Sequence, residues 1–175
     1  MKRIATFALF SLAIATSTAF ADGAQSGHDH SAHQAAPAAA INVPAAAKDA
    51  VAAVERFSSA LAAGRLDDAG AELAPDVLVL ESGGAERSAA EYLGGHAKGD
   101  AAFLKGAHVQ LTRRTAKISG DLVWVASESE MHYTRDGKPV TSLSTETMVL
   151  QRLRGAWKIV HIHWSSRTKT PAAAH

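Results

Sequence analysis

Residues 157–165 read Trp-Lys-Ile-Val-His-Ile-His-Trp-Ser, and this is the most informative segment of the chain. Successive side chains of a β-strand leave opposite faces of the sheet, and the segment alternates accordingly. Two histidines in line with an isoleucine indicate the wall of a half-apolar cavity rather than a plain core. We therefore expect one face to carry Trp157, Ile159, His161 and His163, and the other to carry Lys158, Val160, Ile162 and Trp164.

Three further strands precede this segment, and each is separated from the next by a short turn. Asp136-Gly137 is a strong signal for a two-residue hairpin, and Gly120-Asp121 and Arg154-Gly155 are suited to the same role. The pattern predicts an antiparallel meander of four strands, at residues 108–119, 122–134, 140–153 and 157–166.

Helical patterns occupy the first half of the predicted domain. Val51 to Leu61 recur at helical spacing, and Gly64 is placed to end that helix. A second short helix from Leu66 stops before Pro75, and a strand follows at residues 76–81. A third helix starts at the capping box of residues 88–91, with a break expected near Lys98 because glycines weaken it. Helices followed by a meander predict an α+β fold.

The terminal strand and this order of elements resemble the SnoaL-like branch of the nuclear-transport-factor-two-like superfamily. The resemblance covers residues 48–167 and implies a cone-shaped α+β fold, with N-terminal helices packed on a curved antiparallel sheet. It also implies one deep pocket and a homodimer formed through the outer face of the sheet. It narrows the fold more than the function, because this fold hosts unrelated activities.

The hairpin turns allow an estimate of strand register. If each turn has two residues, Arg114, Ser127, Glu146 and His163 form one polar row across four strands. The next two rows would be Ala116, Val125, Met148 and His161, and then Ile118, Val123, Leu150 and Ile159. A gradient from apolar to ionisable side chains is typical of a concave ligand site, although one β-bulge would invert a strand.

These rows predict a binding site for a small ligand. The candidate ligand-binding residues are Arg114, Ser127, Glu146, Met148, His161 and His163. One alternative is an acid–base enzyme of the isomerase or hydro-lyase type, in which Glu146 and His163 are the candidate catalytic couple and Arg114 holds an oxyanion. Another is a satisfied polar network with a structural role. We expect ligand binding rather than catalysis.

Three other residues give weaker signals. Glu81 ends the first predicted strand, and Tyr92 and His96 are four residues apart on the third helix, where they would line the mouth of the pocket.

The two ends of the chain differ in composition from the domain. Residues 1–21 have a basic start, an apolar stretch and the cleavage-site pattern Ala19-Phe20-Ala21, which predict a signal peptide cleaved near Ala21. We therefore expect export to a periplasm and no membrane association after cleavage. Residues 22–47 are expected to form a linker and residues 168–175 a flexible tail.

The linker contains a short histidine-rich tract that is a candidate metal site. Imidazoles bind copper and zinc, and His28, His30 and His33 can reach one ion without a fold. Weak, unselective binding is expected, and a periplasmic metal-handling role is a further alternative. No cofactor is required by any pattern in the chain.

Composition narrows the possible functions. The chain has no cysteine, which excludes disulfides, thiol catalysis and thiolate metal sites. The formal net charge of +1 gives no electrostatic case for nucleic acid as a partner.

Overall fold

The structure is a computed structural model that describes residues 38–170. The predicted signal peptide, the histidine-rich tract and the last five residues lie outside the described residues. The elements, in chain order, are β1 (Ala40–Asn42), a 3-10 turn (Ala45–Ala47), α1 (Lys48–Ala62), α2 (Leu66–Glu72), β2 (Leu73–Glu81), β3 (Gly84–Glu86), α3 (Ala89–Gly94), α4 (His96–Lys105), β4 (His108–Ser119), β5 (Leu122–Arg135), β6 (Lys138–Leu153) and β7 (Ala156–Thr168).

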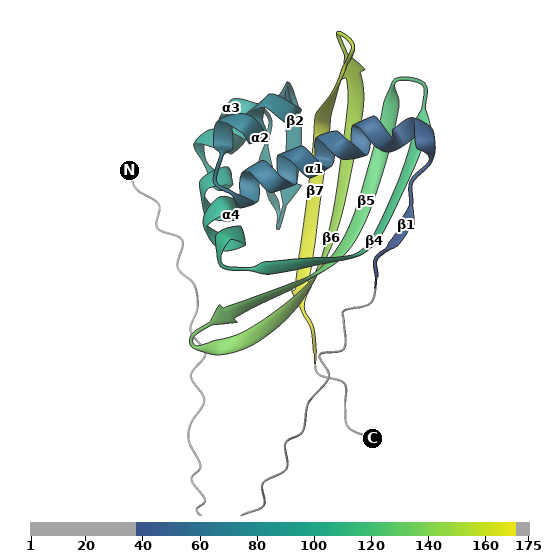
Figure 1. The fold of residues 1–175 in the computed structure, drawn as a ribbon. Helices are drawn as coiled ribbons and strands as arrows, with labels where there is room; N and C mark the ends of the chain where they lie inside the picture. The colour runs from purple at the N-terminus through teal and green to yellow at the C-terminus, as the bar shows by residue number, and fades with distance from the viewer. Residues whose placement is uncertain (1–37, 171–175) are drawn as a thin grey trace, which may run out of the picture. The chain divides into compact units, whose positions relative to one another are not determined.

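The strands form one curved sheet in the order β1-β4-β5-β6-β7-β2-β3. The expected meander of β4 to β7 is present and antiparallel (Figure 1). The sheet as a whole is mixed, however, because β2 runs parallel to β7 and β1 runs parallel to β4. Residues 40–42, which we expected in the linker, form β1. All three are exposed, so no apolar alternation marks them in the sequence.

The three hairpin turns of the meander have two residues each, as predicted. Ser119 pairs with Leu122, Arg135 with Lys138, and Leu153 with Ala156. Asp136-Gly137 and Arg154-Gly155 have positive φ at both turn residues, which matches the twist of the flanking strands.

The predicted helices are also present. Gly64 follows the end of α1 with a φ of 71°, a conformation that glycine adopts without steric cost. Ser88 caps α3 by accepting a hydrogen bond from the Glu91 N–H at 3.1 Å. The break in the third helix is at Gly95 rather than near Lys98. No helix among residues 38–170 has both the length and the apolar character needed to cross a membrane.

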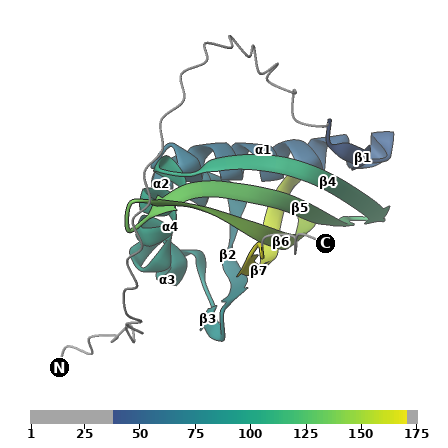
Figure 2. The same ribbon diagram turned by 90° about the horizontal axis from the view of Figure 1, so that it is seen from below.

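The core lies between α1 and the concave face of the sheet. α1 crosses this face, and α2, α3 and α4 gather beside it, as Figures 1 and 2 show. Val54 and Phe57 of α1 are fully buried, as are Val125, Leu150 and Ile159 of the sheet. The curved sheet therefore has a concave face covered in part by helices and a convex face that no described residue covers.

A β-bulge in β7 overturns one part of the predicted register. Leu150 pairs with Ile159, but Val149 pairs with His161, so Val160 is an extra residue. One extra residue moves every later side chain of the strand to the opposite face of the sheet. Our prediction that Glu146 opposes His163 and that Met148 opposes His161 is wrong. Glu146 opposes Trp164, and Met148 opposes Ile162.

Candidate functional site

A polar row crosses the concave face of the sheet. Arg114, Ser127 and Glu146 stand opposite one another on β4, β5 and β6, as the turns predicted. Arg114 Nε donates to Ser127 Oγ at 3.3 Å, and Arg114 Nη1 donates to Glu55 Oε1 of α1 at 2.8 Å. The guanidinium is thus oriented from two sides and holds α1 against β4.

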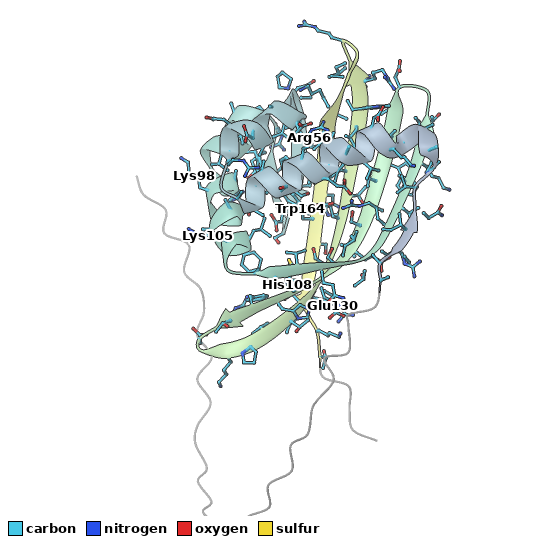
Figure 3. All side chains as sticks on the ribbon, viewed as in Figure 1. Arg56, Lys98, Lys105, His108, Glu130 and Trp164 are labelled. Atoms are coloured by element: carbon cyan, nitrogen blue, oxygen red, sulfur yellow. The ribbon has the colours of Figure 1, made fainter. Side chains whose placement is uncertain are left out.

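Trp164 completes the row in place of His163. Its indole Nε1 donates to Glu146 Oε2 at 2.9 Å, and its ring stacks on Phe57 of α1 with centroids 6.3 Å apart. The Tyr92 ring of α3 lies 6.0 Å from the same indole. Figure 3 shows Trp164 below α1. The indole therefore fixes the Glu146 carboxylate against the helices.

A second carboxyl group approaches the same region from α4. The Tyr92 hydroxyl donates to Asp100 Oδ2 at 2.9 Å, and Tyr92 is fully buried. Burial raises the pKa of Asp100 above its ordinary value, and the negative charge of Glu86 adds to the rise. Burial also raises the pKa of the Tyr92 hydroxyl, with a further contribution from the Asp100 charge. Tyr92 therefore remains a hydrogen-bond donor, and Asp100 is shifted toward its neutral form.

Further ionisable groups lie near Asp100. Glu86 of β3 is buried and pairs with His96 Nδ1 of α4. Burial raises the pKa of Glu81 at the end of β2, and the charge of Asp100 raises it further. Glu81 and His96 are thus both near Asp100, although His96 is mostly exposed.

The two histidines of β7 are on the convex face. His161 pairs with Val149 and His163 with Thr147, and neither lies in the polar row. His161 Nδ1 donates to the carbonyl oxygen of Leu78 at 2.9 Å, while His163 is exposed. A Glu146–His163 acid–base couple is therefore contradicted by the geometry. Met148 is on the concave side but is fully buried in the core.

Sequence reasoning missed two residues of the site. Asp100 belongs to no motif, and its raised pKa depends on burial and on the charge of Glu86, which lies on another element, β3. Trp164 could have been recognised, because burying an isoleucine and a tryptophan stabilises a core more than burying two imidazoles. That comparison favours Ile162 and Trp164 on the concave side.

Apolar side chains lie at the open end of the concave face. The Phe103 ring of α4 meets the Tyr133 ring of β5 edge-on with centroids 5.0 Å apart, and Phe103 is 40% exposed. Val109 of β4, which pairs with Met131, is 45% exposed. An apolar rim beside a polar interior suits a ligand with both kinds of surface.

Two clefts lie elsewhere on the domain. One of about 360 Å³ is lined by Arg56, Glu72, Arg152, Trp157 and Lys158, among others. The other, of about 550 Å³, runs between α1 and α2. Neither includes a residue of the polar row. Three charged groups of the first already have partners: Arg56 Nε donates to Glu72 Oε1 at 2.7 Å, and Lys158 donates to the Ala71 carbonyl oxygen.

Metal ligands are not gathered within residues 38–170: no three His, Asp or Glu side chains there are arranged to hold an ion. The candidate ligands His28, His30 and His33 lie outside the described residues, so that prediction stays a prediction.

Comparison with solved structures gives many matches. A candidate ketosteroid isomerase from Shewanella frigidimarina is 34% identical with a TM-score of 0.66, and the match covers 73% of this chain and 100% of that chain. An NTF2-like protein of unknown function from Pseudomonas putida is 19% identical, with a TM-score of 0.59 and coverage of 69% and 86%. The association domain of CaMKII from C. elegans is also 19% identical, with a TM-score of 0.57 and coverage of 69% and 95%.

The last two similarities show the fold alone. No curated protein matches the sequence. The model of the SnoaL-like domain family matches residues 50–169, which is nearly the whole of the described part of the chain. Together with the curved sheet and the helices on its concave face, this match establishes that the chain belongs to the SnoaL-like domain family.

Proposed function

We propose that this SnoaL-like domain binds a small, partly apolar ligand on the concave face of its sheet. The observation that carries the proposal is the row of Arg114, Ser127, Glu146 and Trp164, which links α1 to four strands. Glu146 and Trp164 are only half-buried, so solvent reaches them. Ser127 is buried and the Arg114 side chain is only 11% exposed, so a ligand there meets chiefly the Glu146 carboxylate and the Trp164 indole.

Neighbouring residues add to this support. One step toward the open end, Ser129 and Ser144 stand opposite each other on the same face. The rim formed by Phe103 and Val109 would receive the apolar part of the ligand. This division between hydroxyls and apolar groups sets orientation as well as affinity.

A thermal-shift screen with anionic and aromatic metabolites tests the proposal, with titration calorimetry on the hits. Glu146→Gln removes the concave carboxylate charge and should weaken binding about tenfold. Glu128→Gln is the matched control, because Glu128 is on β5 but on the convex face. Absence of any hit, or equal weakening by both substitutions, would contradict binding at the row.

A second candidate is an acid–base enzyme of the isomerase or hydro-lyase type. It is favoured by the Tyr92–Asp100 hydrogen bond between α3 and α4, with the raised pKa of Asp100, and by a relative described as a candidate ketosteroid isomerase. Asp100 bonds to Tyr92 and Glu146 to Trp164, whose rings lie 6.0 Å apart, so in this hypothesis the two carboxyl groups are the acid and the base on either side of these rings. Asp100 thus replaces His163 in this hypothesis.

Turnover of a β,γ-unsaturated 3-ketosteroid tests this candidate. Asp100→Asn keeps an acceptor for the Tyr92 hydroxyl but cannot exchange a proton, so it should reduce kcat about a hundredfold or more. Asp76→Asn, at an exposed position of β2, should leave kcat unchanged. Unchanged kcat in Asp100→Asn, or no turnover by the wild type, would exclude this activity.

We also propose that the domain is a homodimer formed through the convex face of the sheet. Trp124 and Leu122 of β5 and Leu78 of β2 are on this face, and all three are at least 36% exposed. Large exposed apolar side chains on one surface mark an interaction site. One similar structure is described as an association domain, which is consistent with this role.

Export to a periplasm is a further proposal that rests on residues 1–21. Expression in a Gram-negative host followed by mass measurement of the periplasmic protein should show cleavage near Ala21. Copper titration into the mature chain, and into a chain that lacks residues 22–34, tests the histidine tract. Equal affinity in both chains would remove His28, His30 and His33 from consideration.

A further inference from the structure

Histidines are concentrated on the convex face of the sheet. Of the five histidines among residues 38–170, four are on this face: His108 and His132 near the β5–β6 hairpin, and His161 and His163 on β7. Only His96 is elsewhere. The bulge at Val160 is the reason that the β7 pair is outside rather than inside the fold.

The strand next to the β7 pair has no charge on this face. The convex positions of β6 are Thr141, Leu143, Thr145, Thr147, Val149 and Gln151. These uncharged residues of β6 form a neutral band on the convex face. His161 stands opposite Val149 and His163 opposite Thr147, so both histidines belong to the neutral band when they are uncharged. Two copies that pack band against band bring neutral surfaces together and keep the flanking cations at the rim. The pattern therefore matches a second copy of this chain.

The charged groups around the band are mostly basic. On β7 itself they are Lys158 and Arg167, and the facing residues of β2, Leu78 and Leu80, are uncharged. Glu128 is 3.5 Å from Arg113, and Glu130 pairs with Lys169 and lies 3.9 Å from His132. The convex charges placed by the strand pairings are Arg113, Lys117, Lys158, Arg167 and Lys169 against Glu128 and Glu130, and the exposed Asp76 lies two residues before Leu78 on β2.

We propose that His161 and His163 make self-association through the convex face dependent on pH, with the dimer weakened in acid. This inference rests on the proposed dimer and adds its regulation. Histidine gains its charge between about pH 8 and pH 5. His161 Nδ1 already donates to the Leu78 carbonyl, so a proton would add at Nε2 without breaking that bond.

The sign of this pH dependence follows from the desolvation of the histidines in the dimer. In a single copy the His163 side chain is exposed to water. Between two packed sheets a charged imidazole loses its hydration and adds to a surface that is already basic, so association favours the neutral form. The dimer then binds fewer protons than two separate copies, and association weakens as pH falls through the histidine range.

Sedimentation equilibrium of the mature protein at pH 7.5 and pH 5.5 tests the inference, with circular dichroism to verify folding at both. The dimer Kd should rise at least about tenfold at pH 5.5. The double variant His161→Gln, His163→Gln should keep its Kd within about twofold between the two pH values. His163→Lys, which carries a permanent charge, should associate weakly at both.

A control variant and the contradicting outcomes complete the test. The control variant His96→Gln keeps an N–H donor for Glu86 and should retain the wild-type pH dependence of association. If the double variant weakens in acid as much as the wild type, or if wild-type association is unchanged or stronger in acid, the inference is overturned while the dimer stands. If the wild type is monomeric at pH 7.5 and high concentration, the proposed dimer itself is overturned.

Discussion

At the scale of single residues, Asp100 shows how the fold alters an ordinary side chain. Its carboxyl group accepts from the fully buried Tyr92 hydroxyl and lies near the charges of Glu81 and Glu86. Nothing in the segment Lys98-Gly99-Asp100 indicates this, because the rise comes from burial in the folded domain and from the charge of Glu86 on β3. A raised pKa set by tertiary neighbours cannot be read from local sequence, whereas the row of Arg114, Ser127 and Glu146 followed from turn length alone.

The raised pKa of Asp100 predicts a particular dependence of stability on pH. The folded state binds this proton more tightly than the unfolded chain, so stability is lost as pH rises from the ordinary aspartate range to the raised folded-state pKa. Asp100→Asn should remove part of that loss. The free energy of unfolding of the variant, relative to that of the wild type, should therefore be higher at pH 7 than at pH 4. Urea unfolding across this range measures the difference.

Two comparisons make the Asp100 result interpretable. Asp76→Asn changes an exposed aspartate of β2 and should leave the wild-type pH profile unaltered. Glu81 also has a raised pKa, so part of the loss should persist in Asp100→Asn. A profile for Asp100→Asn that is parallel to that of the wild type would show that Asp100 ionises as freely in the folded state as in the unfolded chain.

At the scale of elements, the bulge in β7 determines which residues form the site. Perfect alternation would have buried His161 and His163, whereas the extra Val160 buries Ile162 and brings Trp164 to Glu146. Burial of these apolar side chains stabilises the fold by a few kcal/mol more than burial of unpaired imidazoles. The alternation of residues 157–165 is equally regular in either register, which is why the hairpin rule succeeded near the turn and failed beyond Val160.

Deleting single residues tests the bulge. Removal of Val160 should leave the face of every other β7 residue unchanged, because Ile159 and His161 would then oppose Leu150 and Val149 without an interruption. We expect a folded protein destabilised by about 1–3 kcal/mol. Removal of Thr147 from β6 must move every side chain on one side of the deletion to the opposite face of the sheet, and should prevent folding. Thermal melts followed by circular dichroism compare the two, and equal damage would contradict the bulge.

At the scale of the whole molecule, the two faces of the sheet differ in composition. The concave face carries the polar row and the aromatic contacts of Trp164, while the convex face carries exposed apolar groups and the histidines. The helix order and the meander were predictable because their signals are local. The parallel pairings of β1 and β2 were not, because a parallel pairing depends on segments distant in sequence.

Oligomeric state tests the role of the convex face. Trp124→Glu places a charge on the exposed apolar surface and should weaken the dimer by at least about a hundredfold at pH 7.5. Val109→Glu is the control, because Val109 is similarly exposed (45% against 39% for Trp124) but pairs with Met131 on the concave side. Light scattering after size-exclusion chromatography gives both masses. A dimeric Trp124→Glu would place the interface elsewhere.

The most direct test of ligand binding on the concave face uses the three tryptophan indoles. Trp164 is in the concave row, Trp124 is on the convex face, and Trp157 lies at the far end against Arg152. Each gives one indole N–H signal in a ¹⁵N-correlated NMR spectrum. Addition of anilinonaphthalene sulfonate, an anionic aromatic probe, or of a screening hit should shift the Trp164 signal and leave the Trp157 signal in place. A shift of Trp124 alone, with Trp164 unmoved at saturation, would contradict binding at the concave face.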